Sequence, residues 1–335
     1  MLNKARRHEG TKAPREKQTG GCRPFGVFFP LRASVPPCLR ALFCLPCLCA
    51  LLFLASGCQQ PNAILRTPYY GPTLTLSQLI AAVNVNNQKL PTLWASHYYE
   101  ATIVDEKKQS HFVSGDGAFL YRSPDDLRLI GSMELVGTVF DLGSNTNEYW
   151  LKVIPQVDTL WYGRYADLNK AALTAQQVPI EPDMILQVLG IEPIDPDLND
   201  LPAPTLRFNN ESDWYMVVWN VKLPDRWVAQ REIWYDRKTL LPLFVFLYDA
   251  NGRVVLRARL TYHHPVEVAG MPKANWPVVP GRYSLFFPES GSKMELTLNQ
   301  VMLKKGEGAR AVPNDRTFKA PDPANAGVSH IVIIR

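Results

Sequence analysis

The sequence predicts a mainly β protein of the α+β class, a curved antiparallel half-barrel of about eleven strands with a helical lid. Three observations predict it. From residue 97 onward, most runs alternate apolar and polar residues with the period of two that is typical of half-buried strands. Turn-forming residues, such as those at 143–147 and 249–252, separate these runs. Two stretches have helical character, and helices would cover one side of a sheet this wide.

The chain begins with a segment that we expect to be removed. Residues 1–57 are basic at first and then apolar from 41 to 55, and the apolar run ends in Ala55, Ser56 and Gly57. A run of about fifteen residues is short for a membrane span, which needs about twenty, and is typical of a signal peptide. The small residues directly before Cys58 resemble the lipobox of bacterial lipoproteins. We therefore expect a lipid on the Cys58 thiol; a plain secretory signal with an incidental cysteine, or an N-terminal membrane helix, is the alternative.

Cysteine usage and charge support export. Cys58 is the last of six cysteines, and a domain made for an oxidising compartment often has paired cysteines or none. The formal charge of +5 comes from the leader, because residues 58–335 contain 27 Lys and Arg against 29 Asp and Glu. This balance gives no reason to expect a nucleic-acid partner. Gln59 stands where an aspartate typically retains lipoproteins in the inner membrane, so we expect anchoring in the outer membrane, facing the periplasm.

A short tether precedes one long domain. Residues 58–73 are polar and contain Pro and Gly, which is typical of a linker, and residues 74–335 form the predicted domain. Its first element is an amphipathic helix over 74–85 that begins near Thr75 or Ser77. Leu79, Ile80 and Val83 would share its buried face.

The rest of the domain reads as two series of strands around a second helix. The predicted strands cover residues 97–104, 111–121, 126–130, 138–142, 148–154, 159–165, 214–219, 227–235, 242–248, 253–262, 283–287 and 293–298. The helix covers 182–190, with Pro182 near its start and Gly190 at its end. It is apolar nearly all round, so it must lie on an apolar surface. A loop rich in proline and acidic residues is expected over 192–204.

At several places the chain resembles the LolA/LolB-like family of lipoprotein carriers. The resemblance spans roughly 74–335 and is one of pattern. It is carried by the strand and apolar loop at 127–137, the helix at 182–190, the strands around 234–242 and 249–252, the hairpin at 276–301 and the tail at 318–328. The family implies a half-barrel whose helices cover a cavity for acyl chains. A lipid anchor resembles the LolB branch, whereas the extra prolines around 193–204 depart from the core pattern and indicate a distant member.

The resemblance directs attention to apolar side chains that could line such a cavity. The candidate ligand-binding residues are Phe119, Tyr121, Leu129, Phe140, Trp150, Trp161, Met184, Leu186, Leu189, Trp219, Phe244 and Phe246. Each of them could equally be ordinary core. Which strand face points inward depends on register, since a slip of one residue inverts it.

One loop carries a second candidate site. Leu135, followed by Val136, matches the exposed apolar loop residue of the family, which implies contact with a membrane or a ligand. An ordinary hairpin tip is the alternative.

Catalytic and metal sites are not expected. His263 and His264 are adjacent on a strand end, so their side chains should point to opposite faces and cannot easily share a metal. The segment 114–117 lacks the frame of a nucleophile elbow, and no glycine-rich phosphate loop is present. We therefore expect no enzymatic activity, no catalytic residue, no metal and no cofactor.

These observations lead to one expected function and two alternatives. The protein would be an outer-membrane-anchored lipoprotein that holds the acyl chains of a lipid or an acylated lipoprotein in its half-barrel. A protein-interaction or sensing module on the same fold is the first alternative, and its interior would be filled by its own side chains. An envelope hydrolase is the weakest. The sequence does not define the oligomeric state.

Overall fold

Sixteen strands and two α-helices make up the regular structure of the described residues. A computed structural model describes residues 69–104, 107–155, 157–167, 182–209, 212–306 and 312–334, with the side chains of 182–184 left out. The strands are β1 (Thr92–Val104), β2 (Ser110–Arg122), β3 (Asp126–Met133), β4 (Gly137–Ser144), β5 (Glu148–Val153), β6 (Thr159–Arg164), β7 (Ala203–Asn209), β8 (Trp214–Lys222), β9 (Trp227–Asp236), β10 (Pro242–Tyr248), β11 (Val254–Thr261), β12 (His264–Pro265), β13 (Val278–Val279), β14 (Arg282–Phe287), β15 (Ser292–Met302) and β16 (His330–Ile334). The α-helices are α2 (Leu76–Asn87) and α3 (Pro182–Val188), and 3-10 turns cover Tyr165–Asp167, Lys273–Asn275 and Pro323–Asn325.

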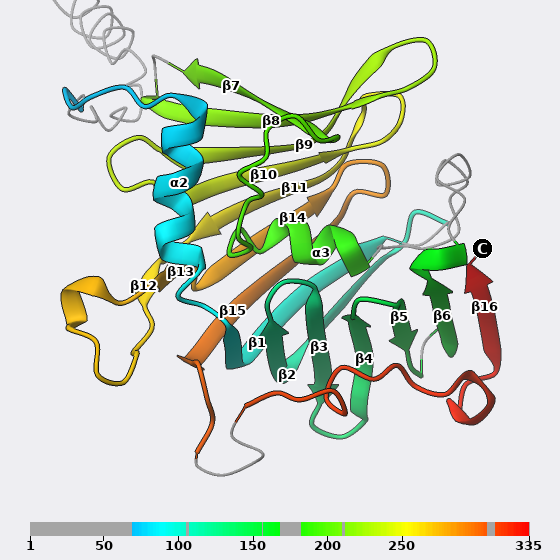
Figure 1. The fold of residues 1–335 in the computed structure, drawn as a ribbon. Helices are drawn as coiled ribbons and strands as arrows, with labels where there is room; N and C mark the ends of the chain where they lie inside the picture. Colours follow the sequence, from blue (N-terminus) through cyan, green and yellow to red (C-terminus); the bar gives the residue numbers. More distant parts are fainter. Residues whose placement is uncertain are drawn as a thin grey trace, which may run out of the picture. The chain divides into compact units, whose positions relative to one another are not determined.

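Fourteen of the strands form one open, curved sheet (Figure 1). Their order is β16-β6-β5-β4-β3-β2-β1-β15-β14-β11-β10-β9-β8-β7, and β12 pairs separately with β13. All neighbours are antiparallel except β16, which runs parallel to β6. The pairing of β1 with β15 joins the meander β1–β6 to the strands β7–β14. The predicted antiparallel architecture is confirmed, but the predicted number of about eleven strands is too low.

The four strands that the sequence did not predict were missed for three different reasons. β7 begins in the proline-rich stretch that was predicted to be a loop, and Pro204 is tolerated there because β7 is the last strand of the sheet. β12 and β13 are two residues each and carry no periodic pattern. β16 pairs with a strand about 170 residues earlier in the chain, and no local signal encodes such a pairing.

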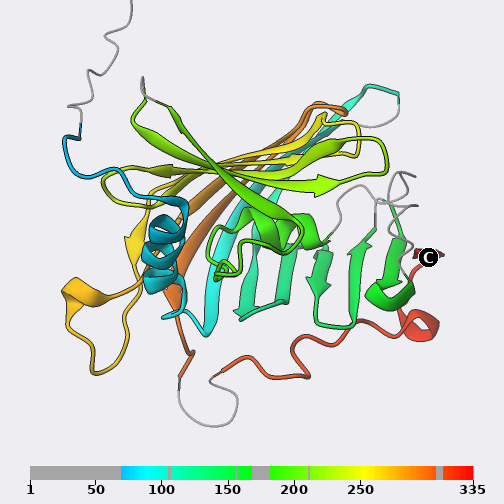
Figure 2. The same cartoon turned by 45° about the horizontal axis from the view of Figure 1, so that its top comes forward.

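Both α-helices lie on one side of the sheet, which we call the helix-covered face. Figure 2 shows β7–β11 arching over α2 and α3. α2 begins where the sequence predicts: Thr75 is its N-cap, and Thr75 and Gln78 form a capping box. The predicted buried residues Leu79, Ile80 and Val83 are at most 3% exposed. None of the described helices is both long enough and apolar enough to cross a bilayer.

The chain after β15 covers part of the opposite face of the sheet. Residues 312–329 run across β3–β6 before β16 joins the sheet edge. Trp150, Leu160, Ala320 and Ala326 form a small second core beneath this segment. The tail therefore belongs to the folded domain rather than trailing from it.

The beginning of the described chain is tied to the other end of the sheet. Arg237, just after β9, donates hydrogen bonds to the carbonyl oxygens of Tyr69 (3.1 Å) and Gly71 (2.8 Å) and to the Thr73 hydroxyl (2.9 Å). Asp213 accepts from Arg237 and from the Tyr69 amide, each at 2.9 Å. We call this group the Arg237 clamp.

Candidate ligand-binding site

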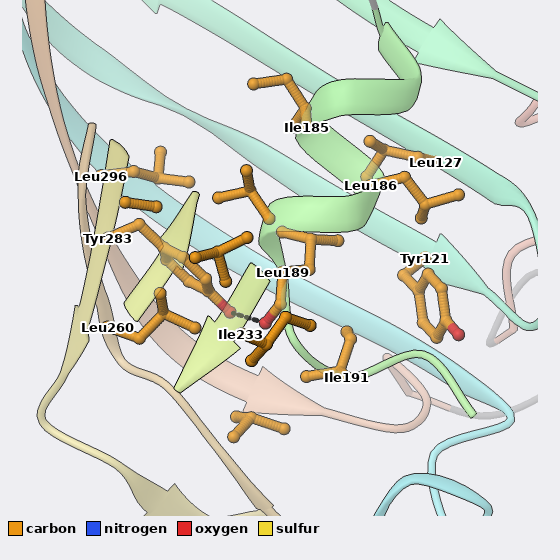
Figure 3. Close-up of a cluster of buried hydrophobic side chains, with 14 of the residues drawn as sticks. Tyr121, Leu127, Ile185, Leu186, Leu189, Ile191, Ile233, Leu260, Tyr283 and Leu296 are labelled. Carbon is orange, nitrogen blue, oxygen red and sulfur yellow. Dashed lines mark hydrogen bonds between the residues drawn. The ribbon is translucent and has the colours of Figure 1, made fainter. Parts of the chain in front are cut away.

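The main core lies between the two helices and the sheet. Figure 3 shows Leu186 of α3 on the side of Leu127 and Tyr121, and Leu189 on the side of Ile233 and Tyr283. The Tyr283 hydroxyl donates to the Leu189 carbonyl oxygen at 3.4 Å. α3 therefore touches apolar side chains from both halves of the sheet, which explains why its sequence is apolar nearly all round.

Eight of the twelve predicted ligand-binding residues share this helix-covered space. They are Phe119, Tyr121, Leu129, Phe140, Trp161, Leu186, Leu189 and Trp219. All are buried except Phe140, which is partly exposed and packs against the cluster. The structure thus brings together residues from five strands and from α3 and the residue after it, and their side chains form one continuous apolar cluster.

Three predicted residues lie on the opposite face. Trp150 points away from the helices, and its indole N–H donates to Asp141 at 3.2 Å beneath the C-terminal segment. Phe244 and Phe246 contact Trp234 with ring centroids 5.5 and 5.1 Å apart, while their neighbours Val245 and Leu247 face the helices. Every position from 242 to 248 is apolar, so alternation alone could not identify the inward face.

Two predicted residues fall outside what the structure describes. The side chain of Met184 is among those left out, although its backbone lies in α3. Cys58 precedes the first described residue, so its lipidation stays a prediction.

Polar side chains that the sequence did not single out tie α2 to the chain after α3. Asn84 both donates to and accepts from the backbone of Ile194, at 2.7 Å each, and Asn87 donates to the Glu192 carbonyl oxygen at 2.7 Å. The Glu192 carboxylate meets Arg231 at 3.3 Å, and the Arg231 guanidinium lies 4.2 Å from the Trp219 ring centre. The sequence did carry a signal for these contacts. Asn84 and Asn87 lie on the apolar side of the helix, and buried amides need hydrogen-bond partners.

A histidine is buried in the sheet under the helix-covered core. His97 is 1% exposed, its Nε2 lies 2.9 Å from the Ile130 carbonyl oxygen, and its Nδ1 has no partner among the described residues. Burial lowers the pKa of His97 to about 4, against the raising effect of that hydrogen bond. Gly117 faces it across the strand pair, where a Cβ atom would come within 2.6 Å of the ring. Burial therefore keeps the ring neutral. The ring fits in this place because residue 117 is a glycine and has no Cβ atom.

The second candidate site is an exposed apolar turn. Leu135 and Val136 connect β3 to β4 and are 97% and 45% exposed, and the Val136 amide donates to the Met133 carbonyl oxygen at 3.2 Å. Leu135 contributes nothing to the core, which agrees both with a contact residue and with an ordinary hairpin tip.

The two adjacent histidines have separate structural partners. His263 Nε2 lies 2.8 Å from the Pro242 carbonyl oxygen, and His264 Nδ1 lies 3.3 Å from that of Tyr262. Burial lowers the pKa of His263. Within the described residues, no three His, Cys, Asp or Glu side chains come together as ligands for a metal ion.

Similar folds occur among solved structures. A LolA superfamily protein from Nitrosomonas europaea is 12% identical with a TM-score of 0.44, covering 74% of this chain and 99% of that chain. A DUF1329 family protein from Desulfovibrio piger is 11% identical with a TM-score of 0.46, over 72% and 97% of the two chains. An outer membrane lipoprotein-sorting protein domain from Vibrio parahaemolyticus is 10% identical with a TM-score of 0.44, over 70% and 94%.

The chain matches no protein-family model and no curated protein. The similar structures include the superfamily that the sequence resembles, as a distant likeness of fold, and they do not distinguish its LolB branch from its LolA branch.

Proposed function

We propose that the protein binds the acyl chains of a lipid or an acylated lipoprotein on the helix-covered face of its sheet, with α3 as a displaceable cover. One observation carries the proposal: a helix of only seven residues contacts apolar side chains from both halves of a curved sheet. Moving such a helix aside would expose a continuous apolar surface, and an acyl chain could then take its place.

The energetics of exchange would be close to balanced. Apolar surface that leaves water contributes roughly 25 cal/mol per Å² whether a protein side chain or a ligand covers it. Replacing the α3 contacts with acyl contacts therefore costs little net free energy, which is what a carrier that must both load and release requires. The proposed function involves no covalent step and no catalysis.

Identification of a co-purifying ligand tests the proposal directly. The Cys58→Ser variant of the full chain, expressed with its leader in a bacterial envelope, would be purified without detergent and examined by native mass spectrometry before and after organic extraction. A stoichiometric lipid or acylated peptide is the expected result. A ligand-free protein, also after incubation with envelope lipids, would contradict acyl binding.

One observation favours a second candidate function. The side chains under α3 are buried and in contact with one another, as expected for a protein-interaction or sensing module that fills its own interior. In that case the protein would remain ligand-free in the experiment above, and cross-linking in the envelope would capture a protein partner instead.

A further inference from the structure

A hollow lies on the opposite face of the sheet, near its β7 edge. It has a volume of about 500 Å³, within the ~300–1,000 Å³ typical of small-molecule sites. Its walls come from β7–β10 and from the turns after β8 and β10. Its lining residues include Val218, whereas Val217 and Trp219 beside it face the helices, so this hollow is separate from the proposed acyl site.

A β-bulge helps to shape this hollow. Trp219 pairs with Arg231 and Asn220 with Ala229, so Gln230 is an extra residue in β9. Bulges of this kind re-aim the side chains beside them. Arg226 adds a wall by donating to the Ala250 carbonyl oxygen at 3.1 Å, which links the two turns.

The hollow has an aromatic platform at its rim. Trp227 lines it and is 57% exposed. An exposed indole ring beside polar side chains offers a flat face on which an apolar part of a ligand can stack.

A buried carboxylate lies among the lining residues. Glu232 is 7% exposed and accepts from the Trp234 indole N–H at 2.5 Å and from the Tyr248 hydroxyl at 2.8 Å. It has no ion-pair partner in the described part of the chain, and a carboxylate can accept about four hydrogen bonds. These two donors leave acceptor capacity on a carboxylate that lines the hollow.

The other polar groups complete a mixed set of donors and acceptors. Arg207 supplies guanidinium donors and has no carboxylate partner among the described residues, while Asn220 donates its amide N–H groups to the protein and keeps its oxygen as an acceptor. Glu232 disfavours an anion and Arg207 disfavours a cation, while the charge of Arg226 is already paired with Asp225 at 2.9 Å. An apolar C–H face ringed by hydroxyl groups fits this arrangement, and we propose that the hollow binds a saccharide.

Titration with defined sugars tests the proposal on the full chain. Glucose, galactose, mannose, N-acetylglucosamine, galacturonic acid and their disaccharides would be followed by calorimetry and tryptophan fluorescence. At least one should bind with a Kd of about 1 mM or tighter, and Trp227→Ala should weaken it about tenfold or more. Arg207→Ala should also weaken it. Trp94→Ala, which removes a tryptophan from another surface hollow, should leave it unchanged.

Three outcomes would overturn the assignment. These are no binding by any member of the panel, equal binding by the Trp227→Ala variant, or binding of inorganic phosphate that is lost on Arg207→Ala while sugars do not bind. The last result would identify an anion site. None of these outcomes bears on acyl binding at the helix-covered face.

Discussion

Leu135 is the most exposed of the large apolar side chains in the described part of the chain. It is 97% exposed on a tight turn, so its replacement removes no packing. We expect Leu135→Glu to change the free energy of unfolding by no more than ~0.5 kcal/mol, as is usual for surface positions. If the turn contacts a membrane or a ligand, the same variant should lower lipid transfer between vesicles several-fold. An unchanged transfer rate would contradict the contact role of Leu135, and Leu135→Gln separates the effect of charge from that of polarity.

Asp141 holds the C-terminal segment through Arg128. Arg128 donates two hydrogen bonds to its carboxylate, at 3.1 and 2.7 Å, and a third at 2.8 Å to the Thr317 carbonyl oxygen. Asp141 is 7% exposed, and breaking a buried pair from one side costs ~3–5 kcal/mol. Asp141→Ala should lose about that much in urea unfolding and should speed proteolysis within 312–329. Asp225→Ala, which breaks an exposed pair with Arg226, should cost under ~1 kcal/mol.

His97 should make stability depend on pH. Its pKa is about 4 in the folded chain, against 6.5 for a histidine in water, so the unfolded chain binds the additional proton between these values. Its contribution is therefore fully present above about pH 6.5 and is lost as the pH falls toward 4, by roughly 3 kcal/mol in total. Urea unfolding from pH 7 to 4 should show a shallower fall for His97→Gln than for the native chain. Parallel profiles would exclude His97 as the cause.

At the scale of elements, the sequence predicted those helices and strands that are marked by short-range signals. Thr75 and Ser77 marked the start of α2, of which the structure uses Thr75 as the N-cap, and the proline and glycine around 182–190 marked α3. The twelve predicted strands are all present. β7 was missed because its pairing with β8 overrides the proline signal. β16 was missed because it pairs with β6 over a long sequence distance.

The sequence predicted which apolar residues are candidates for the site, but it did not predict on which face of the sheet each of them lies. Where strands alternate clearly, as at Phe119 and Tyr121, the predicted residues lie in the helix-covered core. Where all positions are apolar, as around Phe244 and Phe246, either face was compatible with the sequence. The hollow assigned to a saccharide was missed because no local signal marks the β-bulge in β9 that helps to shape it, although the turn at 249–252 beside it was predicted.

Truncation of a side chain in α3 distinguishes a cover from an ordinary core helix. Leu186 is 7% exposed, and Leu186→Ala should lower the free energy of unfolding by ~2–4 kcal/mol in either case. If α3 occupies the ligand's place, however, a smaller side chain makes it easier to displace, and acyl-chain affinity should rise. A fluorescent fatty-acid titration would show this. Leu160→Ala, in the second core on the opposite face of the sheet, is the matched control and should lose stability without gaining affinity.

At the scale of the whole molecule, the proposed lipid anchor decides where the domain works. We expect Cys58→Ser to release the full-length protein from envelope membranes into the periplasmic fraction, because no other lipid attachment site is predicted. Fractionation followed by immunoblotting measures the distribution. Continued membrane association of the variant would contradict anchoring at Cys58.

The Arg237 clamp would limit the distance between the folded domain and a lipid anchor at Cys58. Only the ten residues 59–68 separate Cys58 from Tyr69, the first residue that the clamp holds. Even fully extended, the eleven steps from Cys58 to Tyr69 reach no more than about 40 Å. With a lipid on Cys58, the Tyr69 end of the sheet would therefore stay within that distance of its bilayer. A donor or acceptor on a distant membrane would then have to approach this protein. The protein would bind its ligand at one membrane and would not carry it from one membrane to another.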